Sequence, residues 1–159
     1  MKLINKISVI FLLIFVLTFF IATYILKEKK TNISKPISLN LLTSVHPDLP
    51  WNFKPIKSIV LIKPGEVTTI EYMVENNSNK ESTGVATFAY FPNQVGTYIS
   101  KINCFCYDAK TLKPLQKEKY VVILLIDPEV TKDPKTNDIK DITIQFTFFE
   151  YKKALENKS

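Results

Sequence analysis

The chain begins with a long uncharged apolar segment and then changes to short alternating patterns. Residues 7–26 contain no charged side chain and only four polar ones. A helix of this length rises about 30 Å, at about 1.5 Å per residue, which matches the hydrocarbon layer of a bilayer. The pattern predicts a single membrane-spanning helix over 7–26, preceded by a short N-terminal tail of residues 1–6.

A cleaved signal peptide is the alternative interpretation of this segment. Signal peptides have an apolar core of about 7–15 residues, followed by a cleavage site of small residues. The apolar segment here is longer, and Ala22 stands between Ile21 and Thr23. We therefore expect an uncleaved anchor. Lysines flank both of its ends, so charge alone does not set its orientation in the membrane.

Beyond residue 52 the apolar positions recur with the period of β-strands. The clearest case is Ile142–Phe149, where large apolar residues alternate with Thr and Gln. No segment after the anchor shows a long helical period. Six strands are predicted, at Lys57–Ile62, Thr68–Glu75, Val85–Phe91, Tyr98–Tyr107, Tyr120–Ile126 and Ile142–Phe149.

Short strands separated by turns that contain Pro and Asn are typical of a two-sheet β-sandwich. An open barrel is the alternative. The sequence thus predicts an all-β domain over residues 53–150. Residues 27–52 are polar and rich in proline, which indicates a linker. Residues 151–159 form a polar tail that is expected to fray.

Charge and composition exclude several classes of protein. The chain has 159 residues and a net charge of +6, and all its basic residues are lysines. Residues 1–35 carry six lysines against one glutamate, so the basic charge belongs to the anchor rather than to the domain. This distribution argues against nucleic-acid binding, which needs a basic cluster on the domain. Only three glycines are present, and they form no phosphate-binding loop.

The strongest candidate for chemistry is Cys104-Phe105-Cys106. In an extended strand the two cysteines point to one face, with Cα atoms about 6.6–6.8 Å apart. This distance lies at the upper limit for a disulfide, which would need a bend in the chain. Two thiolates on one face suit copper(I), which prefers sulfur and accepts few ligands. Simple burial of both cysteines is the alternative.

The sequence offers fewer ligands for metals other than copper(I). Zinc requires two more ligands, and His46 is the only histidine in the chain. A homodimer could bring four sulfurs together and share a copper cluster. The acidic residues between Asp127 and Asp141 do not have the spacing of an EF-hand loop, and we interpret them as a polar connection between strands.

An ordered set of motifs resembles the CtaG family of cytochrome c oxidase assembly proteins. The set begins with His46–Pro55 and continues from Pro92 into Cys104-Phe105-Cys106-Tyr107. Asp127-Pro128-Glu129 and the strand Thr143–Phe149 complete it. The resemblance extends from about residue 45 to residue 150, which is nearly the whole predicted domain.

The resemblance implies an immunoglobulin-like sandwich that acts as a membrane-anchored copper chaperone and not as an enzyme. It implies that Cys104 and Cys106 bind copper(I), and that the copper B centre of oxidase subunit I is the acceptor. It further implies a domain that faces the periplasm or the mitochondrial intermembrane space. Since the N-terminal segment lacks arginine, it is a poor transit peptide, which favours a bacterial inner membrane with the N-terminus in the cytoplasm.

A second class of function uses the same cysteines. A membrane-tethered thiol–disulfide oxidoreductase would cycle Cys104 and Cys106 between dithiol and disulfide. Such enzymes usually carry C-x-x-C at the start of a helix, where the helix dipole stabilises the thiolate. The C-x-C spacing on a predicted strand lacks this help.

Overall fold

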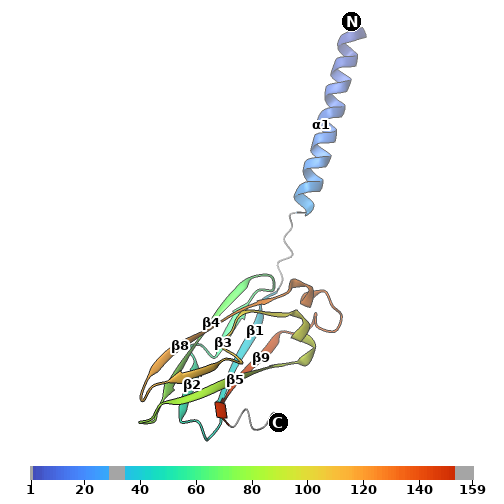
Figure 1. Cartoon of the computed structure of the whole chain (residues 1–159). Coiled ribbons are helices and arrows are strands. Elements are labelled where there is room, and N and C mark those ends of the chain that lie inside the picture. The colour runs from blue at the N-terminus through green and yellow to red at the C-terminus, as the bar shows by residue number, and fades with distance from the viewer. Residues whose placement is uncertain (1, 29–34, 153–159) are drawn as a thin grey trace. The chain divides into compact units, whose positions relative to one another are not determined.

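A computed structural model describes residues 2–28 and 35–152, with side-chain burial described for residues 11–24 and 35–152. The chain divides into two compact units between Ile33 and Ser34. The first contains helix α1 (Lys2–Glu28), and the second contains the β-strands (Figure 1). Two predictions fall partly outside the described residues. They are the fraying of the tail, which concerns mainly residues 153–159, and the part of the predicted linker at residues 29–34.

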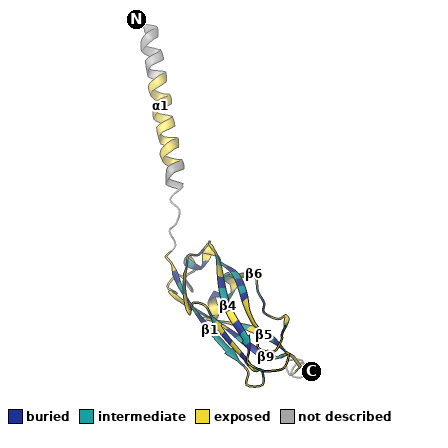
Figure 2. Ribbon diagram, turned by 90° about the vertical axis from the view of Figure 1, so that its left-hand side faces the viewer, coloured by how far each residue is buried: buried dark blue, intermediate teal, exposed yellow. Residues whose placement is uncertain are grey.

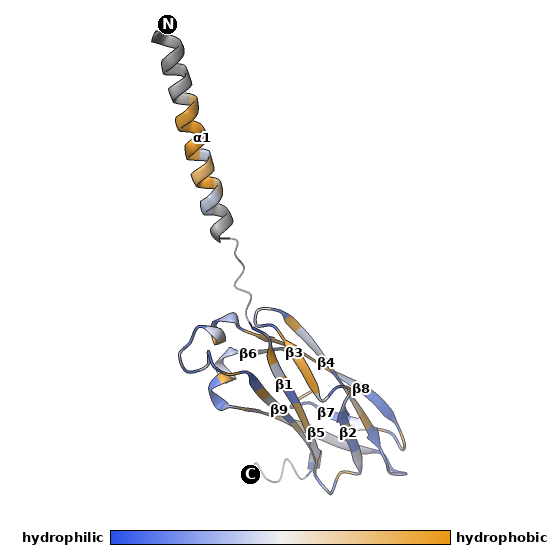
Figure 3. Cartoon of the chain, turned by 180° about the vertical axis from the view of Figure 1, so that it is seen from behind, coloured by the Kyte–Doolittle hydropathy of each residue, from blue (hydrophilic) through white to orange (hydrophobic). Residues whose placement is uncertain are grey.

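Helix α1 is continuous from Lys2 to Glu28, which confirms that the apolar segment is helical. Its described side chains are exposed and mostly apolar (Figure 3). Among the described residues, none of the helices combines the length and the apolar character that a membrane-spanning segment needs. The membrane-spanning role of residues 7–26 therefore stays a prediction.

The second unit contains two β-sheets. One has the strand order β3-β1-β9-β5-β7, and the other has the order β2-β4-β8-β6. All neighbouring strands pair antiparallel except β1 and β9, which are parallel. The strands are β1 (Ile37–Val45), β2 (Trp51–Pro55), β3 (Ile59–Ile62), β4 (Val67–Asn76), β5 (Ser82–Phe91), β6 (Ile99–Asn103), β7 (Ala109–Leu112), β8 (Lys117–Ile126) and β9 (Asp141–Glu150).

Two sheets with no shared strand form the sandwich that the alternating patterns predict, rather than an open barrel. Burial follows the alternation along most of β4, β8 and β9 (Figure 2). In β9, four apolar residues point inward and are fully buried: Ile142, Ile144, Phe146 and Phe148. Because successive side chains of a strand point to opposite faces, the residues between them face outward. The immunoglobulin-like topology implied by the resemblance stays a prediction.

The prediction of a linker over 27–52 is wrong for most of its length, because the domain begins at Ile37 and not at residue 53. Ile37, Leu39 and Leu41 alternate with polar residues, and each is at most 3% exposed. β1 lies between β3 and β9, so these side chains fill the centre of the sandwich. The prolines beside β1 suggested a linker, but the period of two inside the segment decided its structure.

A short turn beside β4 is fixed by one buried amide. Asn76 is fully buried, and its Nδ2 donates to the carbonyl oxygens of Lys80, Leu112 and Lys113 at 2.8–3.2 Å. Its Oδ1 accepts from the backbone amide of Ser78 at 3.0 Å. The asparagine thereby joins the β4–β5 connection to the end of β7, and its own amide group has the hydrogen-bond partners that a fully buried polar group requires.

Two buried tyrosines give the domain a predicted sensitivity to high pH. Tyr72 and Tyr120 face each other across β4 and β8, and neither hydroxyl has a hydrogen-bond partner in the described part of the chain. Burial raises the pKa of both hydroxyls above the ordinary value of 10.0, and Glu118 raises that of Tyr120 further. The unfolded chain loses these protons near pH 10 while the folded chain keeps them. The contribution of the two protonated hydroxyls to the free energy of unfolding is therefore fully present below about pH 10 and is lost as the pH rises above it.

We expect the free energy of unfolding to fall by about 1.4 kcal/mol per pH unit for each tyrosine above about pH 10. Urea unfolding between about pH 9 and pH 11 measures this slope. Tyr72→Phe should make the slope shallower without lowering stability at neutral pH, because it removes an unpaired hydroxyl. Tyr107→Phe is the control, since Tyr107 is 62% exposed. Equal slopes for the wild-type chain and Tyr72→Phe would contradict this account.

Candidate metal site at the Cys104–Cys106 turn

The two cysteines lie on a turn that joins the two sheets. β6 ends at Asn103 and β7 begins at Ala109, and these strands belong to different sheets. Between them the chain bends, and Tyr107 adopts the left-handed backbone conformation, with φ of 70°. The Tyr107 amide donates to the carbonyl oxygen of Ala86 on β5 at 2.9 Å. This hydrogen bond fastens the turn to the five-stranded sheet.

The prediction that one strand runs from Tyr98 to Tyr107 is wrong at its end. The register of β6 against β8 shifts between Lys101 and Asn103, and the strand stops before the cysteines. Their Cα atoms are 5.2 Å apart, closer than in an extended strand, and the two sulfurs form a disulfide. The backbone amide of Cys106 also donates to Sγ of Cys104 at 3.2 Å. The bend that a disulfide requires is therefore supplied by the turn between the sheets.

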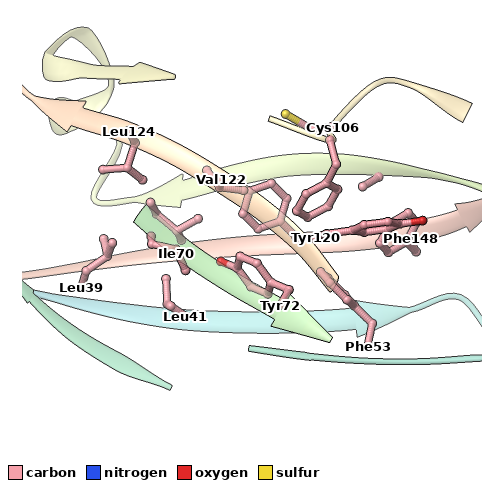
Figure 4. Packing of buried hydrophobic residues seen from close by; sticks show 14 of the residues in the cluster. Leu39, Leu41, Phe53, Ile70, Tyr72, Cys106, Tyr120, Val122, Leu124 and Phe148 are labelled. Carbon is pink, nitrogen blue, oxygen red and sulfur yellow. The ribbon is translucent and has the colours of Figure 1, made fainter. Parts of the chain in front are cut away.

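Burial differs along the three residues of the motif. Cys104 is half-buried, whereas Phe105 is 6% and Cys106 is 7% exposed. The Phe105 ring lies among aromatic rings from both sheets. Cys106 lies at the margin of this cluster (Figure 4). The alternative drawn from sequence, simple burial of both cysteines, fits Cys106 better than Cys104, and the two sulfurs are bonded to each other rather than free.

Charged side chains surround the turn without contacting the sulfurs directly. The Lys101 ammonium lies over the rings of Phe88 and Tyr107, with 4.3 and 5.2 Å to their centroids. Lys110 forms an ion pair with Asp108 at 3.7 Å. An open depression beside the turn is lined by Asn103, Cys104, Phe105, Asp108, Lys110, Glu118, Lys119, Tyr120 and Val121. The turn is thus accessible from outside on its Cys104 side.

His46 is not brought to the cysteines as a ligand. It follows β1, where its Nδ1 lies 3.3 Å from a carboxylate oxygen of Asp48, and its ring lies 5.8 Å from that of Phe149. Over the described ranges, no group of three or more His, Cys, Asp or Glu side chains is placed to hold a metal ion. A closed zinc site within the chain is therefore not formed by the described residues.

The acidic residues from Asp127 to Asp138 lie in the connection between β8 and β9, as the sequence predicted, and some of them hold it in place. Asp127 caps the short helix η2 (Pro128–Thr131) by accepting from the Glu129 amide at 2.9 Å. Asp133 accepts a hydrogen bond from the Tyr98 hydroxyl at 2.5 Å, and this bond holds the pKa of the aspartate carboxyl below its usual range. These contacts tie the loop before β9 to the start of β6.

The chemistry available at the turn depends on its redox state. A disulfide offers no thiolate ligand. After reduction the same turn presents two thiols from residues whose Cα atoms are 5.2 Å apart. Two thiolates form the low-coordinate, sulfur-rich donor set that copper(I) accepts. The donor residues therefore fit copper(I) in the dithiol state and do not fit it in the disulfide state.

The sequence analysis did not predict the cluster of aromatic rings that surrounds Phe105. The sequence showed Phe105 only as the residue between two cysteines, and the extended-strand interpretation placed it on the face opposite to them. One signal was present in the sequence: Tyr120 and Phe148 occupy the inward-facing positions of the alternation in their own strands. The pairing that brings these residues to Phe105 arises between strands far apart in sequence.

Fold and turn together define a β-sandwich protein with a cysteine pair at the junction of its sheets. The sequence profile of the family described as "Cytochrome c oxidase assembly protein CtaG/Cox11" matches residues 18–150. The match includes the C-terminal part of the apolar segment 7–26 and all nine strands that the structure describes. The chain belongs to this family, and the resemblance stated from its motifs is confirmed.

Curated relatives agree with this assignment. The chain is 39% identical over 118 residues to the cytochrome c oxidase assembly protein CtaG of Ehrlichia ruminantium strain Gardel, with 74% of this chain and 67% of the relative covered. It is 37% identical over 119 residues to the protein of the same name from Brucella ovis. There the match covers 75% of this chain and 59% of the relative, so the chain spans about three-fifths of that protein.

Proposed function

We propose that this chain carries copper(I) during cytochrome c oxidase assembly and binds the ion between the thiolates of Cys104 and Cys106. The observation that supports this most strongly is the turn itself, which brings both sulfurs together at the margin of the core. Membership of an oxidase assembly family supplies the process. The copper ion is cargo in this proposal, and the protein acts as a binding and transfer protein rather than an enzyme.

Binding requires reduction of the Cys104–Cys106 disulfide first. A dithiol reductant breaks the bond, supplies two electrons and two protons, and is itself converted to a disulfide. Binding of copper(I) then displaces the protons of the two cysteine thiols. Transfer to the acceptor occurs by exchange of these sulfur ligands for ligands of the acceptor. No bond of an organic substrate is broken.

The proposal also includes an acceptor and a location. We propose the copper B centre of oxidase subunit I as the acceptor of the copper ion. Helix α1 serves as a single-pass anchor in a bacterial inner membrane, through residues 7–26, with its N-terminus in the cytoplasm. The domain then lies in the periplasm, where protease added to spheroplasts should digest it.

Anaerobic titration with copper(I) tests the proposal on the full-length chain in detergent. The reduced chain should hold about one ion against a competing chelator, and the disulfide-bonded chain should hold none. Binding by the oxidised chain would show that the ligands lie elsewhere. A dimeric mass of the copper-loaded chain, at whatever ratio of copper to chain, would instead indicate the shared cluster of a homodimer.

A thiol–disulfide oxidoreductase is the second candidate, and the disulfide itself favours it. The position of the turn argues against it. Both cysteines follow a strand, and no helix begins at them to stabilise a thiolate through its dipole. Disulfide exchange with a reduced client protein, combined with no copper retained in the titration, would reverse the order of the two candidates.

A further inference from the structure

We propose that Phe105 is a positioning residue, whose buried ring holds both neighbouring cysteines in the geometry that binds the ion. The copper part of this inference rests on the proposed function. The geometric part does not, because it concerns how the turn is held in the folded chain.

The first observation is how completely the ring is enclosed. Phe105 is 6% exposed, although it belongs to a turn and not to a strand. Its ring is tilted against that of Tyr120 at 5.1 Å and stacked with that of Phe148 at 5.8 Å. It also contacts the rings of Phe53, Tyr72 and Phe146, at 5.0–5.8 Å between centroids. Rings from β2, β4, β8 and β9 therefore fix one residue of the turn.

The second observation is the position of this residue in the chain. Phe105 is covalently bonded to Cys104 on one side and to Cys106 on the other. A fixed side chain at the middle residue limits the backbone torsions of both neighbours, which otherwise vary in a loop. The Tyr107 hydrogen bond to Ala86 holds the following residue. Phe105 in the core and Tyr107 on β5 thus hold the turn on both sides of Cys106, and we expect the two thiols to remain near each other after reduction.

The same ring determines which side of the sulfurs is open. Aromatic carbon occupies the inner side, where Figure 4 shows the rings of Tyr72, Tyr120 and Phe148. Within the described ranges, no third His, Cys, Asp or Glu joins the pair to form a larger ligand group. An ion on the two sulfurs would therefore have its open coordination positions on the outer side. An acceptor ligand can approach there without disturbing the core.

The test compares Phe105→Leu with Leu39→Ala in the full-length reduced chain in detergent. Leu39 is the control, because it is fully buried in the same core, is not adjacent to a cysteine in the chain, and lies away from Cys106 in Figure 4. Both variants should lose stability. Only Phe105→Leu should weaken copper(I) affinity, by about tenfold or more, as expected for a residue that orients metal ligands. Equal affinities for the two variants would overturn the proposal.

A readout without copper separates this inference from the proposed function. Equilibration with glutathione measures how readily the Cys104–Cys106 disulfide forms, and Phe105→Leu should make it about tenfold less favourable, a shift of about 30 mV. Leu39→Ala should leave this equilibrium unchanged. A wild-type chain that binds no copper(I) would remove the proposed function, while the glutathione equilibrium would still decide the role of Phe105. If Phe105→Leu does not fold, Phe105→Met, which nearly conserves volume with a flexible side chain, replaces it in both measurements.

Discussion

Replacing both cysteines by serine should abolish copper(I) binding by the reduced chain. Serine keeps nearly the size of cysteine but offers a neutral hydroxyl, which is a poor ligand for a soft ion. Since the described residues contain no cluster that could take over, no copper should remain against a competing chelator. Cys104→Ser and Cys106→Ser alone should each leave one thiolate and weak binding. Anaerobic titration of the four chains measures the effect.

The double variant should still fold, and this makes the comparison interpretable. The disulfide closes a loop of only three residues, so its removal costs about 1–2 kcal/mol in the chain-entropy treatment. Ser44→Ala is a suitable control, because it alters a hydroxyl on β1 that is hydrogen-bonded to Thr147 at 2.7 Å and leaves both thiols in place. Copper retained by the double variant would refute the assignment of Cys104 and Cys106.

Phe148→Ala should cause the largest loss of stability among single substitutions in the domain, about 3–5 kcal/mol. Its ring is fully buried, and it lies 5.1 Å from the ring of Trp51 and 4.9 Å from that of Phe53. It also stacks against Phe105. Truncation would leave a cavity where both sheets and the turn meet, and the surrounding rings cannot fill it without leaving their own contacts. Urea unfolding of the full-length chain measures the change.

The next residue of the same strand provides the control. Phe149 points to the outer face of β9, where it is partly exposed and lies near His46. Phe149→Ala should therefore cost less than half as much as Phe148→Ala, since it removes less buried surface and opens no cavity. Equal losses would show that the alternation does not place these two side chains on opposite faces.

Most strands were visible in the sequence because each strand carries its own alternation. The segments around β4, β5, β8 and β9 were predicted within a few residues of their observed bounds. β1 carries the same alternation, in Ile37, Leu39 and Leu41, but flanking prolines concealed it. β7 was not predicted, because its four residues do not alternate between apolar and polar positions.

The motif residues of the candidate site were also predicted from sequence, whereas their geometry was not. Cys104 and Cys106 are the only cysteines, so any soft-metal or thiol chemistry had to involve them. An extended conformation placed the separation of their Cα atoms at the upper limit for a disulfide. The observed 5.2 Å depends on the end of β6 at Asn103, which is set by its register with β8.

The sequence by itself determined the helical segment, the all-β class of the domain, the cysteine pair and the family. These properties depend on local periodicity, on composition and on motifs that lie in order along the chain. The tertiary structure decided where the domain begins, that the cysteines occupy a turn between the sheets, and that Phe105 enters a ring cluster below them. These features depend on which distant strands become neighbours, and pairing between distant segments leaves no local pattern in a single sequence.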